Sequence, residues 1–366
     1  MGPGGAERVA ALLANAWVER GYAVTLVVTY AGGVECFYPL SRNVRLLFLA
    51  NLGARAGRGA LAYWTRLNAL RSLIAQLRPD VVVSFLSRVN IAAVIASAGL
   101  RNALIVCERT FPPSFPLGRI WELLRRVTYP RASRVVMVSS EGLNWLESHI
   151  PSAKGVHIPN PVVYPLPGGT PVVAPEHVIQ PHRKVLLAVG RLDRGKQFDR
   201  LLKSFANLAT DFSEWDLVIV GDGPERARLE QQALKLNLTR RTVLLGPVGN
   251  LGDWYRRADL FVMSSRFEGF PNSLAEAMAH GCTAVSYDCD TGPRDIIRHG
   301  VDGLLVGPVG DVKALTQALR RLIANDVERA RFAARAVEIR ERFSMERILG
   351  MWDALFESVS VPTGTP

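Results

Sequence analysis

Two carboxylates and two cations stand where buried strands pass into helices. Glu268 and Glu276 flank a loop that contains Gly and Pro and the start of a helix. Arg191 and Lys196 follow the apolar run 184–189. Carboxylates accept hydrogen bonds from hydroxyl groups, and Arg and Lys neutralise phosphate. These residue types suit a ligand in which phosphate joins two hydroxyl-rich groups, as in a nucleotide-sugar.

The apolar run 259–263 is short and continuous, which predicts a buried parallel strand. A helix begins near Ser273, and the free N–H groups of a first helical turn attract anions. Simpler interpretations stay open on these residues alone. Ser273 and Glu276 fit a capping box, Glu268 fits a solvated loop residue, and Arg191 and Lys196 fit surface cations.

The string 268–276 reads Glu-Gly-Phe-Pro-Asn-Ser-Leu-Ala-Glu. It resembles the Glu-x7-Glu motif of retaining family 4 glycosyltransferases with the GT-B fold. The segments 277–281, 284–286 and 300–306 continue the resemblance in order, and it covers nearly the whole chain. It implies an α/β protein with two Rossmann-like, doubly wound domains that face a cleft.

The resemblance also implies roles for individual residues. Arg191 and Lys196 would bind the diphosphate and stabilise its leaving charge, an electrostatic form of catalysis. Glu268 would accept hydrogen bonds from the sugar, and Glu276 from the ribose. The other residues expected at the nucleotide-sugar are Gly4, Gly5, Gly190, Gly246, Val248, Gly269, Phe270, Pro271, Asn272, Ser273 and Leu274.

An acceptor side is expected in the first half of the chain. Glu108 and Arg109 follow the apolar run 104–106, at the end of a strand where ligands of open α/β sheets bind. A salt bridge within the loop is an equally good interpretation. The segments 55–78 and 119–134 combine aromatic and basic residues, as in helices that lie on a membrane surface, although most such helices simply cover a sheet.

The net charge of +11 is unevenly distributed. Residues 1–160 hold 18 Lys and Arg against 8 Asp and Glu, a net charge of +10, whereas the remaining residues hold 26 against 25. The first half is therefore expected to meet an anionic partner. An anionic membrane surface or a lipid-linked pyrophosphate fits, and nucleic acid is disfavoured because no motif for reading it is found.

The domain boundaries follow from changes in composition. We expect an acceptor-binding domain over 1–160, a Pro- and Gly-rich linker over 161–182, a nucleotide-sugar-binding domain over 183–343, and a helix within 344–366 that crosses back to the first domain. Gly4 and Gly5 open a helix that normally follows a strand, so the first strand of the first domain is expected to be missing.

The sequence predicts neither a metal site nor a membrane-spanning segment. Asp288 and Asp290 form an Asp-x-Asp pair that resembles a metal motif, but no other carboxylate is close in sequence, so we expect no metal and no cofactor. No apolar run reaches the roughly 18 residues of a membrane span. Four unpaired cysteines favour a reduced compartment, and we expect a cytoplasmic protein on the membrane surface.

Together these features predict a retaining glycosyltransferase. It would move a hexose or N-acetylhexosamine from a UDP-sugar to a polyprenyl-diphosphate-linked saccharide in surface polysaccharide or glycan assembly. Two alternatives are a non-hydrolysing UDP-sugar epimerase with the same fold and a non-catalytic relative that binds sugar or lipid. The sequence does not indicate the oligomeric state.

Overall fold

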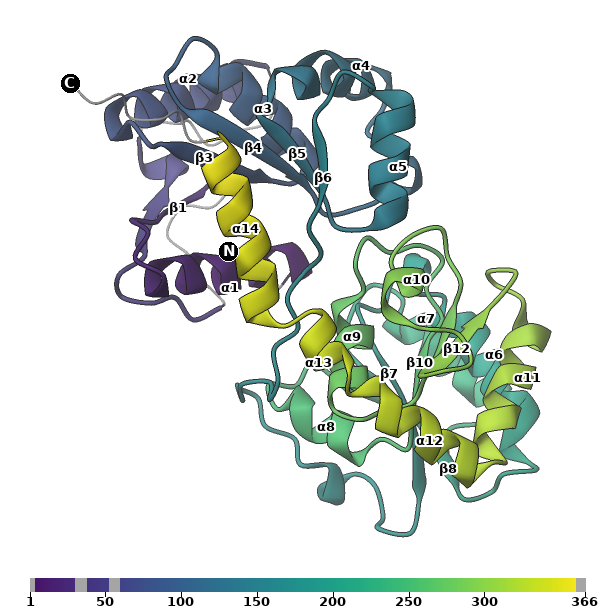
Figure 1. Cartoon of the computed structure of the whole chain (residues 1–366). Coiled ribbons are helices and arrows are strands. Elements are labelled where there is room, and N and C mark those ends of the chain that lie inside the picture. Colours follow the sequence, from purple (N-terminus) through teal and green to yellow (C-terminus); the bar gives the residue numbers. More distant parts are fainter. Residues whose placement is uncertain (1–3, 30–37, 53–59, 360–366) are drawn as a thin grey trace. The chain divides into compact units, whose positions relative to one another are not determined.

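The chain forms two compact units (Figure 1). The computed structural model describes residues 4–29, 38–52 and 60–359. Unit 1 contains residues 1–161 and 346–366, and unit 2 contains residues 162–345. Both units are α/β with parallel sheets, which confirms the predicted fold class.

The strands of unit 1 belong to two sheets. One pairs β1 (Thr25–Val28) with β2 (Arg45–Phe48), and the other has the order β3-β4-β5-β6. The strands of the second sheet are β3 (Val81–Phe85), β4 (Ala103–Glu108), β5 (Arg134–Met137) and β6 (Gly155–His157). In the described residues no strand precedes the first helix, α1 (Gly5–Glu19), which begins directly after Gly4.

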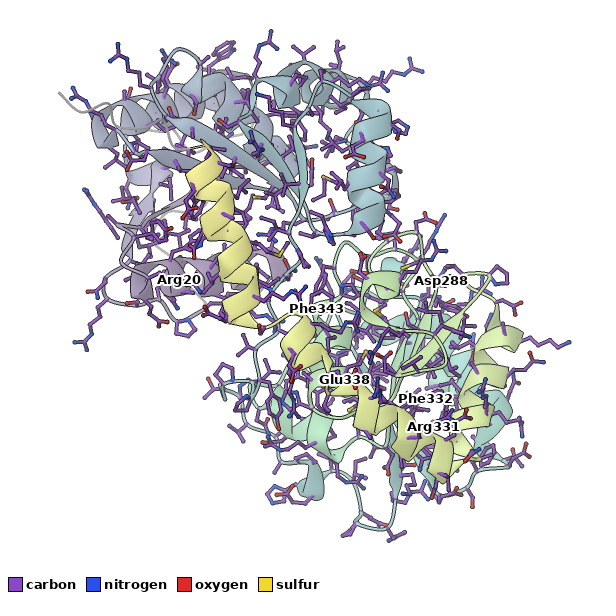
Figure 2. All side chains as sticks on the ribbon, in the orientation of Figure 1. Arg20, Asp288, Arg331, Phe332, Glu338 and Phe343 are labelled. Atoms are coloured by element: carbon purple, nitrogen blue, oxygen red, sulfur yellow. The ribbon has the colours of Figure 1, made fainter. Side chains whose placement is uncertain are left out.

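Five further α-helices lie in the described residues of unit 1. They are α2 (Ala60–Leu77), α3 (Ser87–Ser97), α4 (Arg119–Thr128), α5 (Ser140–His149) and α14 (Met345–Val359). The last of them lies against α1, where Trp17 contacts the rings of Trp352 and Phe356 at 5.3 and 5.4 Å between centroids. Arg20, marked in Figure 2, forms ion pairs with Asp353 and Glu346 of α14. Helix α14 is thereby part of the core of unit 1.

Unit 2 contains one parallel sheet with the order β12-β11-β10-β7-β8-β9. Its strands are β7 (Lys184–Val189), β8 (Trp215–Val220), β9 (Thr242–Gly246), β10 (Leu260–Met263), β11 (Ala284–Tyr287) and β12 (Gly303–Val306). Its helices are α6 (Phe198–Ala209), α7 (Arg226–Lys235), α8 (Leu251–Arg257), α9 (Asn272–Ala279), α10 (Pro293–Ile296), α11 (Val312–Ile323), α12 (Asp326–Ala336) and α13 (Ile339–Arg342). The central strands are buried, which explains why they are continuous apolar runs.

The segment predicted as a linker, 161–182, is packed onto unit 2. The backbone of Val173 exchanges hydrogen bonds with the side chain of Asn250, and Trp254 Nε1 donates to the Val173 carbonyl at 2.9 Å. Ile179 is buried. These contacts fix the segment in place, so it is not a free tether.

Candidate functional site

The site lies at the switch point of the unit 2 sheet. From β7 the sheet extends one way through β8 and β9, and the other way through β10, β11 and β12. Loops at the carboxyl ends of the two strands that flank such a point diverge and leave a crevice, which is where open α/β sheets bind ligands. The loops in question follow β7 and β10, and they carry Lys196 and Glu268.

The loop after β7 is held by local caps and by glycine. Asp193 accepts hydrogen bonds from the N–H groups of Gly195 and Lys196, which forms the short 3-10 turn Arg194–Lys196. The loop after β8 approaches so closely that a Cβ on Gly221 would lie 2.1 Å from the Gly190 carbonyl oxygen, and Gly221 has a φ of +134°. Only glycine has room for this close approach and readily adopts this positive φ, so Gly221 allows the two loops to lie side by side.

The loops after β7 and β10 are joined by hydrogen bonds. Ser264 Oγ donates to the Lys196 carbonyl at 2.8 Å, and the Arg266 N–H donates to the Gly195 carbonyl at 2.8 Å. Lys196 Nζ then lies 2.5 Å from Glu268 Oε1. Burial works against the Lys196 charge, but the neighbouring Glu268 carboxylate outweighs it and raises the pKa of Lys196. Lys196 is therefore a fixed cation at the switch point.

The N-terminus of α9 opens beside these loops. Pro271 precedes the helix and no side chain caps it, so the capping box of Ser273 and Glu276 considered from the sequence is not formed. Glu276 is instead buried, and its Oε2 accepts a hydrogen bond from Tyr255 at 3.1 Å. An uncapped helix start next to a cation is suited to a phosphate group.

Thr291 and Gly292 support the Glu268 loop, although sequence reasoning did not select them. Thr291 Oγ1 donates to the Glu268 carbonyl. Gly292 has a φ of +93°, and a Cβ there would lie 2.6 Å from Pro271 Cδ. The Gly-Pro step at Gly292 was the available signal, because such steps mark tight turns.

The Asp-x-Asp pair does not form a metal centre in the part of the chain that the structure describes. The Asp288 carboxylate accepts two hydrogen bonds from Arg294, at 2.6 and 3.1 Å. No three metal-binding side chains cluster among the described residues. Cys289 is no nucleophile, because burial and the nearby Glu268 raise the pKa of its thiol to about 12.

The remaining predicted residues divide between the units. Gly246 ends β9 and its carbonyl accepts from the Gly221 N–H at 2.9 Å, which joins the ends of β8 and β9. The contact of Gly246 and Val248 with the nucleotide-sugar stays a prediction. Arg191 is exposed and forms no ion pair with any described residue. Gly4 and Gly5 belong to unit 1, so their predicted contact with the nucleotide-sugar stays a prediction.

Glu108 of unit 1 lies inside a buried polar network. Its carboxylate accepts hydrogen bonds from Ser87 Oγ at 2.7 Å and from the Tyr129 hydroxyl, and its Oε1 lies 3.3 Å from Arg125 Nε. The side chains of Glu108 and Arg125 are each only 1% exposed. Glu108 therefore forms a salt bridge to α4 rather than within its own loop, and its acceptor-side role stays a prediction.

Arg109, the next residue in the chain, has different surroundings from Glu108. Its Nη1 donates to Asn160 Oδ1 at 2.6 Å, and its guanidinium carbon lies 4.5 Å from the centre of the Phe85 ring. Its Nε and Nη2 are buried and have no hydrogen-bond partner. Burial lowers the pKa of the Arg109 guanidinium. Its acceptor-side role remains a prediction.

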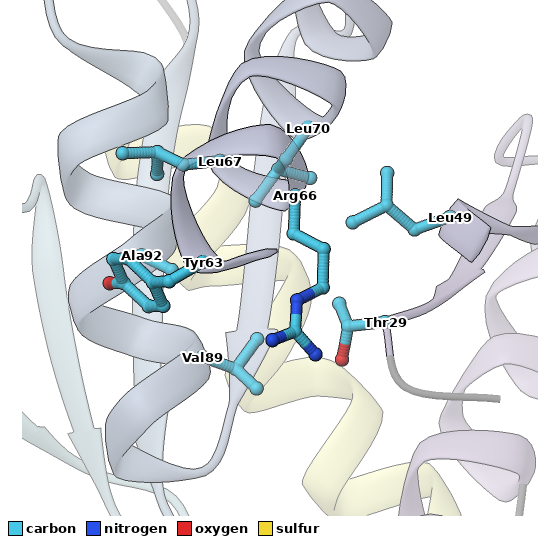
Figure 3. A pocket seen from close by; sticks show the side chains of 8 residues that line it. All are labelled: Thr29, Leu49, Tyr63, Arg66, Leu67, Leu70, Val89 and Ala92. Atoms are coloured by element: carbon cyan, nitrogen blue, oxygen red, sulfur yellow. The ribbon is translucent and has the colours of Figure 1, made fainter. Parts of the chain in front are cut away.

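A small hollow also lies in unit 1, with Arg66 reaching towards Thr29 and Val89 (Figure 3). Its volume of about 30 Å³ has room for no more than a water molecule or two. It is too small for a sugar and contributes nothing to the site.

The fold defines a class of two-unit α/β proteins, here with a lysine–glutamate pair at the switch point of the second sheet. Comparison with known proteins narrows that class. Residues 3–163 match the protein family described as "Glycosyltransferase Family 4", and residues 172–338 match the family described as "Glycosyl transferases group 1". The chain therefore belongs to the glycosyltransferases, with a family 4 domain followed by a group 1 domain.

Two curated relatives span nearly the whole chain. It is 29% identical to the amylovoran biosynthesis glycosyltransferase AmsD of Erwinia amylovora, over 96% of this chain and 95% of AmsD. It is also 29% identical, over 97% of this chain and 96% of the relative, to a Campylobacter jejuni alpha-1,4-N-acetyl-D-galactosaminyltransferase whose name includes a diNAcBac-PP-undecaprenol saccharide.

Solved structures confirm the GT-B fold. The Anabaena protein HepE in complex with UDP and glucose matches with a TM-score of 0.81 at 19% identity, over 98% of this chain and 97% of HepE. The lipopolysaccharide outer core galactosyltransferase WaaB matches with a TM-score of 0.75 at 20% identity, over 97% of this chain and 96% of WaaB. These likenesses establish the fold.

Proposed function

We propose that this glycosyltransferase moves a hexose or N-acetylhexosamine from a UDP-sugar to a polyprenyl-diphosphate-linked saccharide, with retention of anomeric configuration. The observation that carries the proposal is the pairing of Lys196 with Glu268 at the switch point of unit 2. A fixed cation beside an uncapped helix start suits the diphosphate, and the carboxylates beside it suit the hydroxyl groups on either side. UDP is also bound by the structural neighbour HepE.

Each residue has a chemical task in this proposal. Lys196 and Arg191 neutralise the diphosphate as it leaves, with help from the N–H group of Ser273 at the start of α9. The N–H group of Leu274, also expected to help, donates instead to the Pro271 carbonyl at 3.1 Å. Glu268 holds Lys196 in place and accepts hydrogen bonds from the sugar. Glu276, buried and oriented by Tyr255, accepts them from the ribose.

The acceptor is proposed to arrive on a membrane surface. In α4, Ile120, Leu123 and Val127 are 75%, 63% and 46% exposed, and their spacing places them on one face of the helix. Arg119 and Arg126 of the same helix are exposed as well. An apolar stripe flanked by cations suits an anionic lipid surface. No described helix has both the length and the apolarity that would let it cross a bilayer.

The test is nucleotide release from UDP-, GDP- and ADP-sugars in the presence of polyprenyl-diphosphate saccharides. Wild type, Glu276→Gln and a matched control, Glu214→Gln, are compared. Glu214 is exposed and lies just before β8, at the opposite edge of the sheet from the site. We expect acceptor-dependent release from a UDP-sugar that falls about 100-fold in Glu276→Gln and is unchanged in the control.

Two results would contradict the proposal. One is release that does not depend on any acceptor, as epimerisation or hydrolysis of the donor would give. The other is equal release by wild type and Glu276→Gln. Inversion at the anomeric carbon, seen by NMR of the product, would remove the retaining mechanism while leaving the transferase in place.

A further inference from the structure

Arg109 presents an unoccupied pair of hydrogen-bond donors. The N–H of Nε and one N–H of Nη2 point the same way from a guanidinium group, and together they form the fork that binds two oxygens of one anion. In Arg109 both of these nitrogens are buried and neither has a hydrogen-bond partner. The third nitrogen, Nη1, is occupied by Asn160. The side of the group that recognises oxyanions is therefore the side left open.

Other buried arginines of the chain are paired. Arg125 lies beside Glu108 and Glu122, and Arg329 donates to Asp326 and to the Leu322 carbonyl. Arg109 has no carboxylate partner in the part of the chain that the structure describes. A buried cation with unpaired N–H groups is costly to the fold. Arg125 also has a buried Nε without a hydrogen-bond partner, but that nitrogen lies 3.3 Å from the Glu108 carboxylate. Unpaired N–H groups at Arg109, which has no such carboxylate beside it among the described residues, point to a ligand that completes the site.

The surroundings hold the fork in a fixed direction. Phe85 is the last residue of β3, Arg109 follows β4, and Asn160 follows β6. The carboxyl ends of three parallel strands of one sheet thus build the site, at the edge where open α/β sheets bind ligands. The Phe85 ring covers one face of the guanidinium at 4.5 Å, and the hydrogen bond to Asn160 prevents rotation of the plane.

We infer that Arg109 is a binding residue for a phosphate oxyanion, and that its ligand is the diphosphate of the lipid-linked acceptor. The identity of the ligand rests on the proposed function, whereas the oxyanion site rests on the fork alone. A diphosphate suits it better than a carboxylate because unit 1 carries a large positive excess, +10 over residues 1–160. Both nitrogens are screened from water, and a hydrogen bond formed by a charged group in such surroundings is strong.

The experiment compares two acceptors that carry the same saccharide, one on a polyprenyl diphosphate and one on an uncharged alkyl chain. KM and kcat for each are measured at saturating donor in wild type, Arg109→Gln, Arg109→Lys and Arg101→Gln. Arg101 is exposed and has no partner among the described residues, so its variant removes the same charge from the same unit. We expect Arg109→Gln to raise the KM of the diphosphate acceptor about 10- to 100-fold and to leave that of the alkyl acceptor unchanged.

Arg109→Lys is expected to restore only part of the affinity, because a lysine keeps the charge but lacks the fork. Arg101→Gln should behave like wild type. Equal KM changes for both acceptors, or no change in either, would overturn the inference. Melting temperatures are measured alongside, to show that each variant is folded when its KM is compared with that of wild type.

A second measurement separates this inference from the proposed function. Inorganic pyrophosphate and inorganic phosphate are titrated calorimetrically into the full chain carrying Lys196→Ala, with and without Arg109→Gln. We expect pyrophosphate to bind about tenfold more weakly when Arg109 is also replaced. If no nucleotide-sugar is a donor but this difference is found, the proposed function fails and the oxyanion site stands. If pyrophosphate binds equally to both proteins, the oxyanion site is wrong.

Discussion

Each unit contains a carboxylate paired with a cation at the carboxyl edge of its sheet, and the two pairs differ in how completely they are enclosed. In unit 1, Glu108 and Arg125 are both 1% exposed, and hydroxyl groups fill the remaining positions on the carboxylate. In unit 2, Lys196 is 25% exposed and Glu268 is 12% exposed. The first pair is closed, and the second still faces solvent.

On the proposed function, the difference separates a structural ion pair from one that meets a ligand. A carboxylate whose hydrogen bonds are all made inside the protein has little left for a ligand, whereas a partly exposed pair can exchange its partner when a ligand enters. Position in the fold alone does not decide this, because both pairs follow parallel strands at the ligand-binding edge. What decides it is whether the carboxylate already makes all its hydrogen bonds within the protein.

The largest effect that this comparison predicts is on stability. Glu108→Ala leaves Arg125 buried beside Tyr129 with only the partly exposed Glu122 as a carboxylate partner among the described residues, and breaking a buried pair from one side costs about 3–5 kcal/mol. We expect the free energy of unfolding, measured by urea denaturation, to fall by that amount. A control, Glu141→Ala, removes a carboxylate from the start of α5 in the same unit. A loss below about 1 kcal/mol in Glu108→Ala would mean that the network is not the closed pair described here.

The second prediction, for unit 2, is a large effect on turnover and a small effect on stability. Glu268→Gln keeps the shape of the side chain but releases Lys196, so turnover with the UDP-sugar is expected to fall about 100-fold. The free energy of unfolding should change by less than about 1 kcal/mol, because the pair is partly exposed. Steady-state kinetics and urea denaturation on one preparation check both. A large loss of stability with unchanged turnover would make the two pairs alike and remove the distinction.

The sequence was sufficient for the elements of the site and insufficient for its hydrogen bonds. The apolar runs 184–189 and 259–263 predicted strands that the structure places at Lys184–Val189 and Leu260–Met263, since buried parallel strands are continuous and apolar. The sequence left Glu108 undecided between two roles, because its partners Ser87, Arg125 and Tyr129 come from α3, α4 and the turn after it. Local patterns do not encode such contacts.

The fork of Arg109 shows the same limit. Sequence reasoning selected Arg109 by its place at the end of a strand. Its open donors depend on Asn160, which lies 51 residues further along the chain, and on Phe85 from another strand. Only the fold reveals which nitrogen is occupied and which is free.

The third and smallest predicted effect concerns α4. The closed pair anchors the inner face of this helix through Arg125. Because that network holds the helix, its outer residues Ile120 and Leu123 stay exposed to solvent. Replacing both with Asn should weaken binding to phosphatidylglycerol vesicles about tenfold in a sedimentation assay, since less apolar surface enters the membrane. Added salt should weaken wild-type binding as well, because Arg119 and Arg126 contribute by charge.

The matched control for α4 removes two equally exposed apolar side chains from unit 2, Leu234 and Val327. If the Leu234→Asn, Val327→Asn protein loses as much vesicle binding as the α4 variant, general surface apolarity and not α4 drives the association. If only the α4 variant loses it while its melting temperature is unchanged, the closed pair of unit 1 has a functional consequence after all. It would hold rigid the helix that brings the acceptor's membrane to the enzyme, while the open pair of unit 2 carries the chemistry.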